Sequence, residues 1–242
     1  MSKDWTKTRA KVKDFIESEI YPKETELAKG TPEAREMLGS LMQLAKDEKI
    51  WALGHPEDIG GGGMPFMEYV YVNEVIGRSS FAMVALGTHS LQDSIMLREF
   101  ASPHWRDQYL EPLVQGEIFP SFGMTEPDVA SSDPTQLQTT AILDNGTWKI
   151  NGTKWFTTGA ARAAYTTVMC RTELDAPSHG AFSMIIVPTD NPGYKIVRET
   201  PVLGINGGHY EVKYDNVEVP EENLLGPRAV SYTHLTLPTN IG

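Results

Sequence analysis

The sequence predicts an α+β protein in which an N-terminal all-helical domain precedes an antiparallel β-sandwich or barrel domain. Apolar residues recur at steps of three and four up to about residue 116. Beyond that point, short strand-like runs are separated by Pro, Gly, Asn and Asp, and no helix-length amphipathic segment lies between them. This second pattern favours an antiparallel sheet over βαβ units. We therefore expect domains at 1–118 and 119–228, and set 229–242 apart.

Amphipathic helices are expected throughout the first domain. The second helix has Thr31 as a candidate N-cap and Pro32 at its first helical position. The last helix repeats this signal at Ser102-Pro103. The four glycines at 60–63 are interpreted as a turn, because no strand precedes them and no Lys-Ser/Thr follows. In chain order, the expected helices cover residues 5–20, 31–45, 66–76, 90–101 and 103–115.

Strand-like runs fill the second domain. The first run, 136–143, alternates and is rich in Thr and Ile. Asn145-Gly146 then supplies a hairpin turn, and Trp148 starts the return strand. The remaining expected strands lie at 164–170, 181–188, 194–198 and 210–219.

Charge and cysteine content exclude several classes of protein. The 21 basic residues are outnumbered by 32 acidic ones, for a net charge of −11, whereas nucleic acids and anionic membranes are bound chiefly through Lys and Arg. A small phosphorylated ligand stays compatible, because backbone N–H groups can hold it. The single cysteine, Cys170, cannot form an internal disulfide, which favours a reducing compartment. Without a signal core or an apolar run near ~20 residues, we expect a soluble protein that is not secreted.

Common catalytic and metal-binding motifs are missing from the sequence. It contains no Gly-x-Ser-x-Gly elbow, no Cys-x-x-Cys and no His-Glu-x-x-His pair. The six histidines are scattered, and a lone histidine is more often a polar-contact residue than a ligand. We therefore predict no metal site.

Two segments carry groups that suit a planar cofactor. The first, Ser121–Asp133, lies where helices give way to strands and offers hydroxyls and backbone N–H groups. Such donors suit the polar edge of a heterocycle and a pyrophosphate. The second, Asn151–Gly159, places Trp155 two residues before the Thr157 hydroxyl, and an indole face can cover a flat ring. Taken alone, each is more readily explained as an ordinary loop or a core tryptophan.

Together, and in this order, the two segments resemble the acyl-CoA dehydrogenase family. Thr125-Glu126-Pro127 matches the flavin loop of that family, and the segment from Asn151 to Thr157 resembles its Asn-Gly-x-Lys-x-Trp-x-Thr strand. The resemblance extends over about residues 5–228. Weaker matches in register lie at His55–Gly61, Tyr109–Glu117 and Val217–Gly226.

Within the family, one branch is the most similar. The run Asp128–Asp133, followed later by Gly207-Gly208-His209, is most similar to the branch of the animal members ten and eleven. That branch is associated with long or 4-hydroxylated acyl chains, although this sequence alone does not fix a chain length. Two departures from the common pattern stand out: the first loop is one residue longer, and Lys154 and Trp155 are adjacent.

The resemblance implies FAD as cofactor and gives individual residues a role toward it. The backbone from Phe122 through Met124 to Thr125 is expected to line the flavin ring, with Thr125 adding a hydroxyl. Either Ser131 or Ser132 is expected near the FAD pyrophosphate, and Ser132 also near the acyl-CoA. On the strand, the resemblance places Trp155 and Phe156 against the isoalloxazine and Thr157 near its reactive nitrogen.

The reaction implied by the resemblance is α,β-dehydrogenation of an acyl-CoA thioester. A carboxylate removes the α-proton while the β-hydrogen leaves as hydride to FAD. By the same resemblance, this glutamate comes from a third, helical domain after the sheet, so no catalytic residue is assigned here. Residues 229–242 look like translated adapter sequence, and we expect a chain truncated near Arg228, without the C-terminal helical bundle and inactive alone.

Partners and alternatives follow from the same resemblance. An electron-transfer flavoprotein or similar acceptor is expected, with homo-oligomers for the full-length protein. The compartment is the bacterial cytoplasm, or the mitochondrial or peroxisomal matrix. An acyl-CoA oxidase of the same fold stays open, as does a non-catalytic two-domain protein that binds acyl-CoA or FAD.

Overall fold

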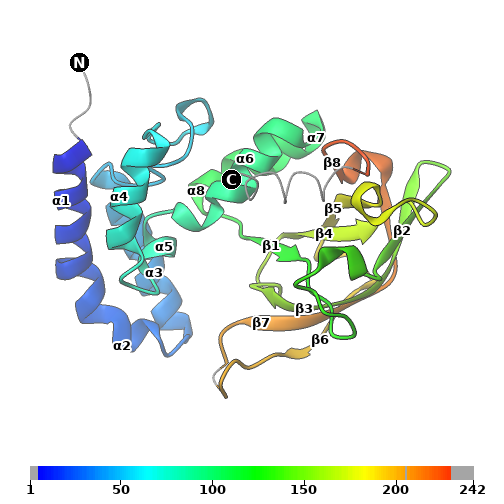
Figure 1. The fold of residues 1–242 in the computed structure, drawn as a ribbon. Coiled ribbons are helices and arrows are strands. Elements are labelled where there is room, and N and C mark those ends of the chain that lie inside the picture. Colours follow the sequence, from blue (N-terminus) through cyan, green and yellow to red (C-terminus); the bar gives the residue numbers. More distant parts are fainter. Residues whose placement is uncertain (1–4, 205, 230–242) are drawn as a thin grey trace. The chain divides into compact units, whose positions relative to one another are not determined.

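The computed structural model describes residues 5–204 and 206–229, which form two compact units (Figure 1). The helical unit comprises Met1–Ile95 with Leu110–Glu117, and the sheet unit comprises Met96–Tyr109 with the chain from Ile118 onward. Helices and a mostly antiparallel sheet are thus segregated along the chain, which confirms the predicted α+β class.

The helical elements follow the expected order, with two short helices, at 24–27 and 82–85, that were not expected. Short 3₁₀ turns lie at Glu57–Ile59 and Thr88–Ser90, and π-helical turns at Ile16–Ile20 and Arg106–Leu110. The first π turn runs on into a 3₁₀ turn at Tyr21–Lys23. The helices are α1 (Trp5–Phe15), α2 (Glu24–Leu27), α3 (Pro32–Asp47), α4 (Phe66–Ile76), α5 (Ala82–Ala85), α6 (Leu91–Phe100), α7 (Pro103–Trp105) and α8 (Glu111–Gln115).

The two predicted helix caps have different outcomes. Thr31 Oγ1 accepts a hydrogen bond from Ala34 N at 3.3 Å, and Pro32 occupies the first helical position of α3, as predicted. Ser102 precedes Pro103 at the start of α7, but its side chain makes no capping hydrogen bond. The Ser102 hydroxyl is instead buried without a partner among the described residues. The prediction of a side-chain cap at Ser102 was therefore wrong.

The core of the helical unit joins α1, α3, α4 and α5. Their apolar stripes bury Val12, Leu41, Ile76 and Ala85 to 3% exposure or less. These positions recur at helical spacing, so one face of each helix is apolar and packs inward. His55 lies in the same interior, with Nε2 3.1 Å from Ser90 Oγ.

The sheet unit is built on one eight-stranded sheet in the order β6-β7-β3-β2-β4-β5-β8, with β1 pairing with β4 in parallel. Residues from β2, β3, β4, β5 and β7 share a single buried core, so the sheet folds over on itself. Two short strands, β1 and β8, were not predicted. The strands are β1 (Pro120–Gly123), β2 (Thr140–Asp144), β3 (Thr147–Thr158), β4 (Tyr165–Arg171), β5 (Phe182–Pro188), β6 (Tyr194–Glu199), β7 (His209–Pro220) and β8 (Leu224–Leu225).

The predicted hairpin joins β2 to β3. Asn145 and Gly146 have φ of 50° and 77°, the left-handed pair that a tight two-residue turn requires. The strand before it starts at Thr140 and not at Gln136 as expected, because the N–H groups of Gln138 and Thr139 donate to a side chain and not to a strand.

The segment 96–109 belongs to the sheet unit. Trp105 stacks on Tyr109 at 4.4 Å between ring centroids, and both rings meet Tyr165 of β4 edge-on. The Phe100 carbonyl accepts the N–H of Gly226, at 3.1 Å. Of the predicted foreign tail 229–242, all but Ala229 lies outside the described residues. No helix in the described part of the chain has the length and apolar character needed to cross a bilayer.

Candidate functional site

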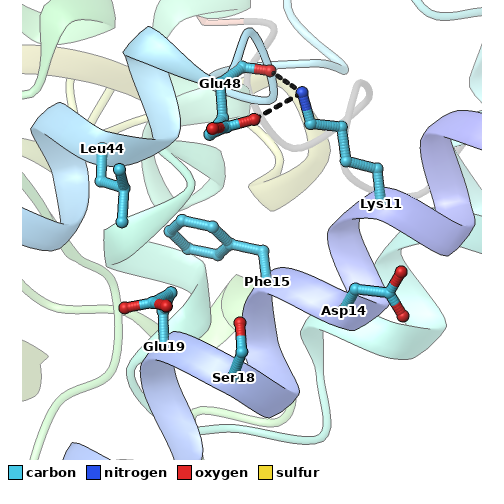
Figure 2. A pocket seen from close by; sticks show the side chains of 7 residues that line it. All are labelled: Lys11, Asp14, Phe15, Ser18, Glu19, Leu44 and Glu48. Carbon is cyan, nitrogen blue, oxygen red and sulfur yellow. Dashed lines mark hydrogen bonds and ion pairs between the residues drawn. The ribbon is translucent and has the colours of Figure 1, made fainter.

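A pocket of about 270 Å³ lies on the helical unit between α1, its π-helical extension and α3 (Figure 2). Lys11 Nζ contacts both the carbonyl oxygen and a carboxylate oxygen of Glu48, at 2.6 and 2.7 Å. None of the predicted cofactor residues lines this pocket; all of them lie in the sheet unit. The lining residues are Lys11, Asp14, Phe15, Ser18, Glu19, Leu44 and Glu48.

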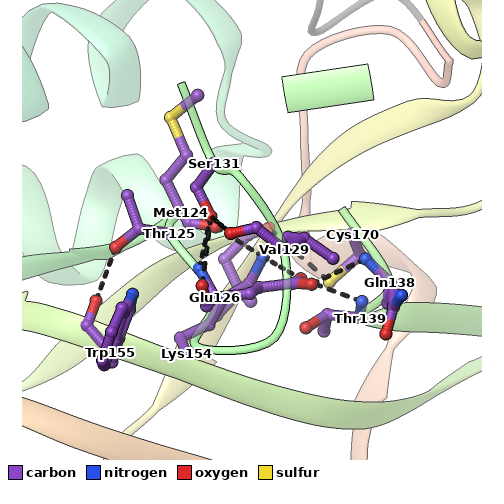
Figure 3. Close-up of polar contacts among 11 residues, drawn as sticks. Met124, Thr125, Glu126, Val129, Ser131, Gln138, Thr139, Lys154, Trp155 and Cys170 are labelled. Carbon is purple, nitrogen blue, oxygen red and sulfur yellow. Dashed lines mark hydrogen bonds and ion pairs between the residues drawn. The ribbon is translucent and has the colours of Figure 1, made fainter. Parts of the chain in front are cut away.

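The two sequence segments singled out above meet in the sheet unit. Thr125 and Trp155, 30 residues apart, are joined twice: Trp155 N donates to Thr125 O at 3.0 Å, and Thr125 Oγ1 donates to Trp155 O at 2.7 Å (Figure 3). The loop that leaves β1 is therefore fixed against the middle of β3. This geometry places the predicted residues Met124, Thr125 and Trp155 at one location.

A buried ion pair lies directly behind that junction. Lys154 Nζ is 2.8 Å from Glu126 Oε1 and donates to Met124 O at 2.8 Å. The Glu126 carboxylate also accepts the N–H groups of Gln138 and Thr139, at 2.7 and 2.9 Å. Lys154 is 0% exposed and Glu126 4%. One carboxylate thus joins the start of the loop to its end.

The charge states of the pair follow from their contacts. Burial by itself raises the pKa of the Glu126 carboxyl, but the Lys154 ammonium and the donated hydrogen bonds outweigh it, so this pKa lies below its ordinary value. Burial lowers the pKa of the Lys154 ammonium, against the opposing effect of Glu126. Glu126 is therefore held as a carboxylate whose oxygens are already occupied by donors.

The structure separates the two candidate serines. Ser131 Oγ accepts the N–H of Glu126 at 2.8 Å and lies 3.2 Å from Glu126 O, so its hydroxyl closes the loop internally. Ser132 is exposed. Among the described residues, no acceptor takes the N–H groups of residues 129–132. The outer side of the loop therefore presents backbone donors and the Ser132 hydroxyl.

Strand β3 carries a bulge at the other half of the site. Its pairing with β7 shifts register between Lys154 and Thr157, and Phe156 has a left-handed φ of 49°. Phe156 is 39% exposed and lies between the rings of Trp155 and His209, with centroid distances of 4.8 and 6.2 Å. An aromatic row thus follows the outer face of the bulge.

The two threonines after the bulge face opposite ways. Thr157 is 0% exposed, and its hydroxyl has no partner in the part of the chain that the structure describes. Thr158 is exposed, and its Oγ1 lies 2.8 Å from His209 Nδ1. The hydroxyl on the same face as Phe156 is therefore that of Thr158, a residue to which the sequence analysis gave no role.

Three further residues of the site also had no predicted role. Glu126, Lys154 and His209 were quoted only as parts of motifs. Alternation along β3 would have predicted that Lys154 is buried, because Trp148 and Ile150 face inward and Lys154 lies at the same even spacing. A lysine inside a core requires a carboxylate partner, and Glu126 is the acid of the neighbouring motif.

Two further predicted residues, Phe122 and Met124, lie in or beside β1. Phe122 lies in β1, where it pairs with Thr167 of β4. The side chain of Met124 packs on a small cluster formed by Leu137, Met169 and Phe182. Burial raises the pKa of the Cys170 thiol to about 12, so this cysteine is inert. The described residues contain no cluster of side chains suited to a metal ion.

Comparison with known proteins matches both halves of the chain to one family. Residues 2–117 match the N-terminal domain of acyl-CoA dehydrogenases, and residues 121–217 match the middle domain. The chain belongs to the acyl-CoA dehydrogenase family. This family of flavin-dependent oxidoreductases is the one that the two motifs predicted.

Individual relatives agree with this assignment. A probable acyl-CoA dehydrogenase of Mycobacterium tuberculosis, FadE2, is 38% identical over 232 residues, which is 90% of this chain and 56% of the relative. Acyl-CoA dehydrogenase family member 10 of the mouse is 35% identical over 231 residues, 88% of this chain and 22% of the relative. The chain therefore spans between about a fifth and just over half of these relatives.

The fold agrees with a solved family structure. A putative acyl-CoA dehydrogenase from Mycobacterium abscessus superimposes with a TM-score of 0.88 at 30% identity, over 97% of this chain and 63% of the other. The helical and sheet units are therefore both of the acyl-CoA dehydrogenase type.

Proposed function

We propose that this chain forms the FAD-binding part of an acyl-CoA dehydrogenase, with the cofactor held at the 121–133 loop and the β3 bulge. The observation that carries this proposal is that a surface of backbone donors and a surface of aromatic rings lie next to each other. In the 124–133 loop, the N–H groups of residues 129–132 meet no acceptor that the structure describes, and the Ser132 hydroxyl is exposed. The bulge offers an exposed aromatic row. Donors suit a pyrophosphate and the polar edge of a heterocycle, and aromatic faces suit its plane.

The residues divide between these two tasks. We assign Phe122, Met124 and Thr125 to the edge of the flavin ring through their backbone, since the Thr125 hydroxyl already donates to Trp155 O. Ser132 is assigned to the pyrophosphate and the acyl-CoA, with Ser131 shaping the loop behind it. Trp155 and Phe156 cover the ring.

The hydroxyl closest to the flavin edge is assigned to Thr158. Thr157, expected near the reactive nitrogen from the family resemblance, is 0% exposed. Thr158 is exposed and already held by His209. This pair supports a polar contact on the same face as Phe156.

The chemistry that bound FAD supplies is acceptance of a hydride from the β-carbon of an acyl-CoA thioester. The described residues hold and orient the cofactor. Glu126, the acid nearest the loop, is buried and accepts donors at both oxygens, so it does not serve as the base that removes the α-proton. We infer that the base, the electron acceptor and the acyl chain specificity belong to the whole protein.

Titration of the purified chain with FAD tests the proposal. We expect saturable binding, seen as quenching of flavin fluorescence, and weaker binding for Phe156→Ala. Ile196→Ala removes a comparably exposed apolar side chain on β6 and serves as the control, with unchanged affinity expected. A folded chain that binds no FAD at micromolar concentrations contradicts the proposal.

A second measurement separates the possible reactions. Addition of an acyl-CoA to the flavin-loaded whole protein, which would include the base, bleaches the flavin absorbance if the bound cofactor is reduced. Oxygen uptake without an added acceptor identifies an oxidase. Binding of acyl-CoA without bleaching identifies a non-catalytic protein of the same fold.

A further inference from the structure

The ion pair behind the candidate site is unusually well enclosed. Lys154 and Glu126 are both almost fully buried, and their charged atoms lie 2.8 Å apart. Replacing such a pair by apolar residues is often neutral or favourable for stability, because desolvation offsets the attraction between the charges. A contribution to folding stability therefore does not explain why this position holds an ion pair. The contacts of the pair indicate a role in shaping the loop.

One contact of the pair and two contacts beside it turn three successive carbonyl groups into the protein. The Met124 carbonyl accepts from Lys154 Nζ at 2.8 Å, the Thr125 carbonyl from Trp155 N at 3.0 Å, and the Glu126 carbonyl lies 3.2 Å from Ser131 Oγ (Figure 3). Carbonyl oxygens that faced outward here would repel an anionic ligand. With these three carbonyl groups turned inward, the N–H groups of residues 129–132 stay available for such a ligand.

The same pair also closes the far end of the loop. Glu126 receives the N–H groups of Gln138 and Thr139, so twelve or more residues of loop begin and end on one carboxylate. Thr139 is further confined by Gly152 of β3, where an added Cβ would lie 2.3 Å from Thr139 Oγ1. The loop is thus shaped by contacts within the protein, independently of a ligand, and preorganisation of this kind strengthens binding.

We propose that Lys154 and Glu126 are positioning residues that preset the 124–139 loop for the pyrophosphate-bearing cofactor. The inference rests on the proposed function and adds to it the residues that shape the donor surface. Neither residue touches the cofactor. Lys154 acts through the Met124 carbonyl, and Glu126 acts through the backbone of Gln138 and Thr139.

Removal of both charges tests this role. The double variant Lys154→Met/Glu126→Gln leaves no unpaired buried charge, so we expect it to fold. Its dissociation constant for FAD should rise at least about tenfold, which is about 1.4 kcal/mol. Hydrogen exchange at Gln138 and Thr139 should accelerate. Thr172→Val is the matched control, because it breaks a buried hydroxyl pair with Ser183 elsewhere in the sheet unit and should retain wild-type affinity.

The outcomes separate this inference from the proposed function. Wild-type chain that binds no FAD overturns both. Wild-type binding together with equal binding by the double variant, or an equal loss in Thr172→Val, overturns only the role of the pair. Should the double variant fail to fold, hydrogen exchange of the wild-type chain without FAD replaces it. The N–H groups of Gln138 and Thr139, which Glu126 accepts, should then exchange slowly, and fast exchange in the free chain overturns the inference.

Discussion

At the scale of single residues, Phe156 combines an unfavourable backbone with an exposed ring. A left-handed conformation costs a non-glycine residue about 1 kcal/mol or more, and Phe156 adopts it with φ of 49°. The ring is 39% exposed, so the free energy gained by burying it offsets this cost only in part. Strained positions of this kind cluster at binding sites. The conformation is therefore consistent with a role in presenting the ring to a ligand.

Two substitutions of Phe156 separate the backbone from the ring. Phe156→Gly and Phe156→Ala both remove the aromatic face, so both should weaken FAD binding to a similar degree. Only glycine accepts the left-handed φ without steric cost, so Phe156→Gly should be more stable than Phe156→Ala by about 1 kcal/mol. Chemical denaturation and FAD titration of the two variants provide the measurement. Wild-type FAD affinity in either variant contradicts a role for the ring.

Strand alternation explains which residues could be assigned from the sequence. Trp148, Ile150 and Lys154 follow the period of two and all face inward. The bulge at Trp155 and Phe156 breaks that period. The family resemblance assigned Thr157 to the flavin, whereas the structure buries Thr157 and exposes Thr158. A bulge is created by pairing with β7, which is more than 50 residues away, and local sequence does not encode it.

At the scale of elements, the two predicted helix caps offer a comparison within one chain. Thr31 makes its capping hydrogen bond to Ala34 N, so Thr31→Ala should destabilise the protein by about 1 kcal/mol. Ser102 makes none and has a buried hydroxyl without a described partner, so Ser102→Ala should be neutral or slightly stabilising. Thermal unfolding of the two variants measures the difference. Equal losses would show that Ser102 also caps its helix.

Most elements were predictable because their signals are local. Thr31-Pro32 and Asn145-Gly146 fix a helix start and a hairpin turn through neighbouring residues alone. The start of β2 depends instead on Glu126, which takes two N–H groups that would otherwise extend the strand. That contact joins residues more than ten positions apart, and neither turn chemistry nor hydrophobic period reveals it. The ends of elements near the site were therefore the hardest to predict.

At the scale of the whole molecule, the two units carry different acid-sensitive groups. In the helical unit, burial lowers the pKa of His55 from 6.5 to about 4. In the sheet unit, the pKa of Glu126 lies below its ordinary value of 4.5. A histidine with a lowered pKa favours the folded state above 6.5, and this contribution is lost as pH falls toward 4. The contribution of Glu126 is present above 4.5 and is lost only at lower pH.

On acidification His55 destabilises the helical unit, while Asp93 of the same unit, whose pKa burial raises from 3.8 to about 6, opposes that loss. A fall in the His55 pKa from 6.5 to about 4 corresponds to about 3 kcal/mol, lost progressively between those two pH values. Protonation would add a donor at Nδ1, which has no partner among the described residues. As the pH falls from 6.5 to 4, hydrogen-exchange protection of peptides from α3 and α4 should weaken less in His55→Gln than in wild type. His104→Gln, at an exposed histidine, should behave like wild type. Since the two units carry separate cores, simultaneous loss of protection in both would mean that they unfold as one body.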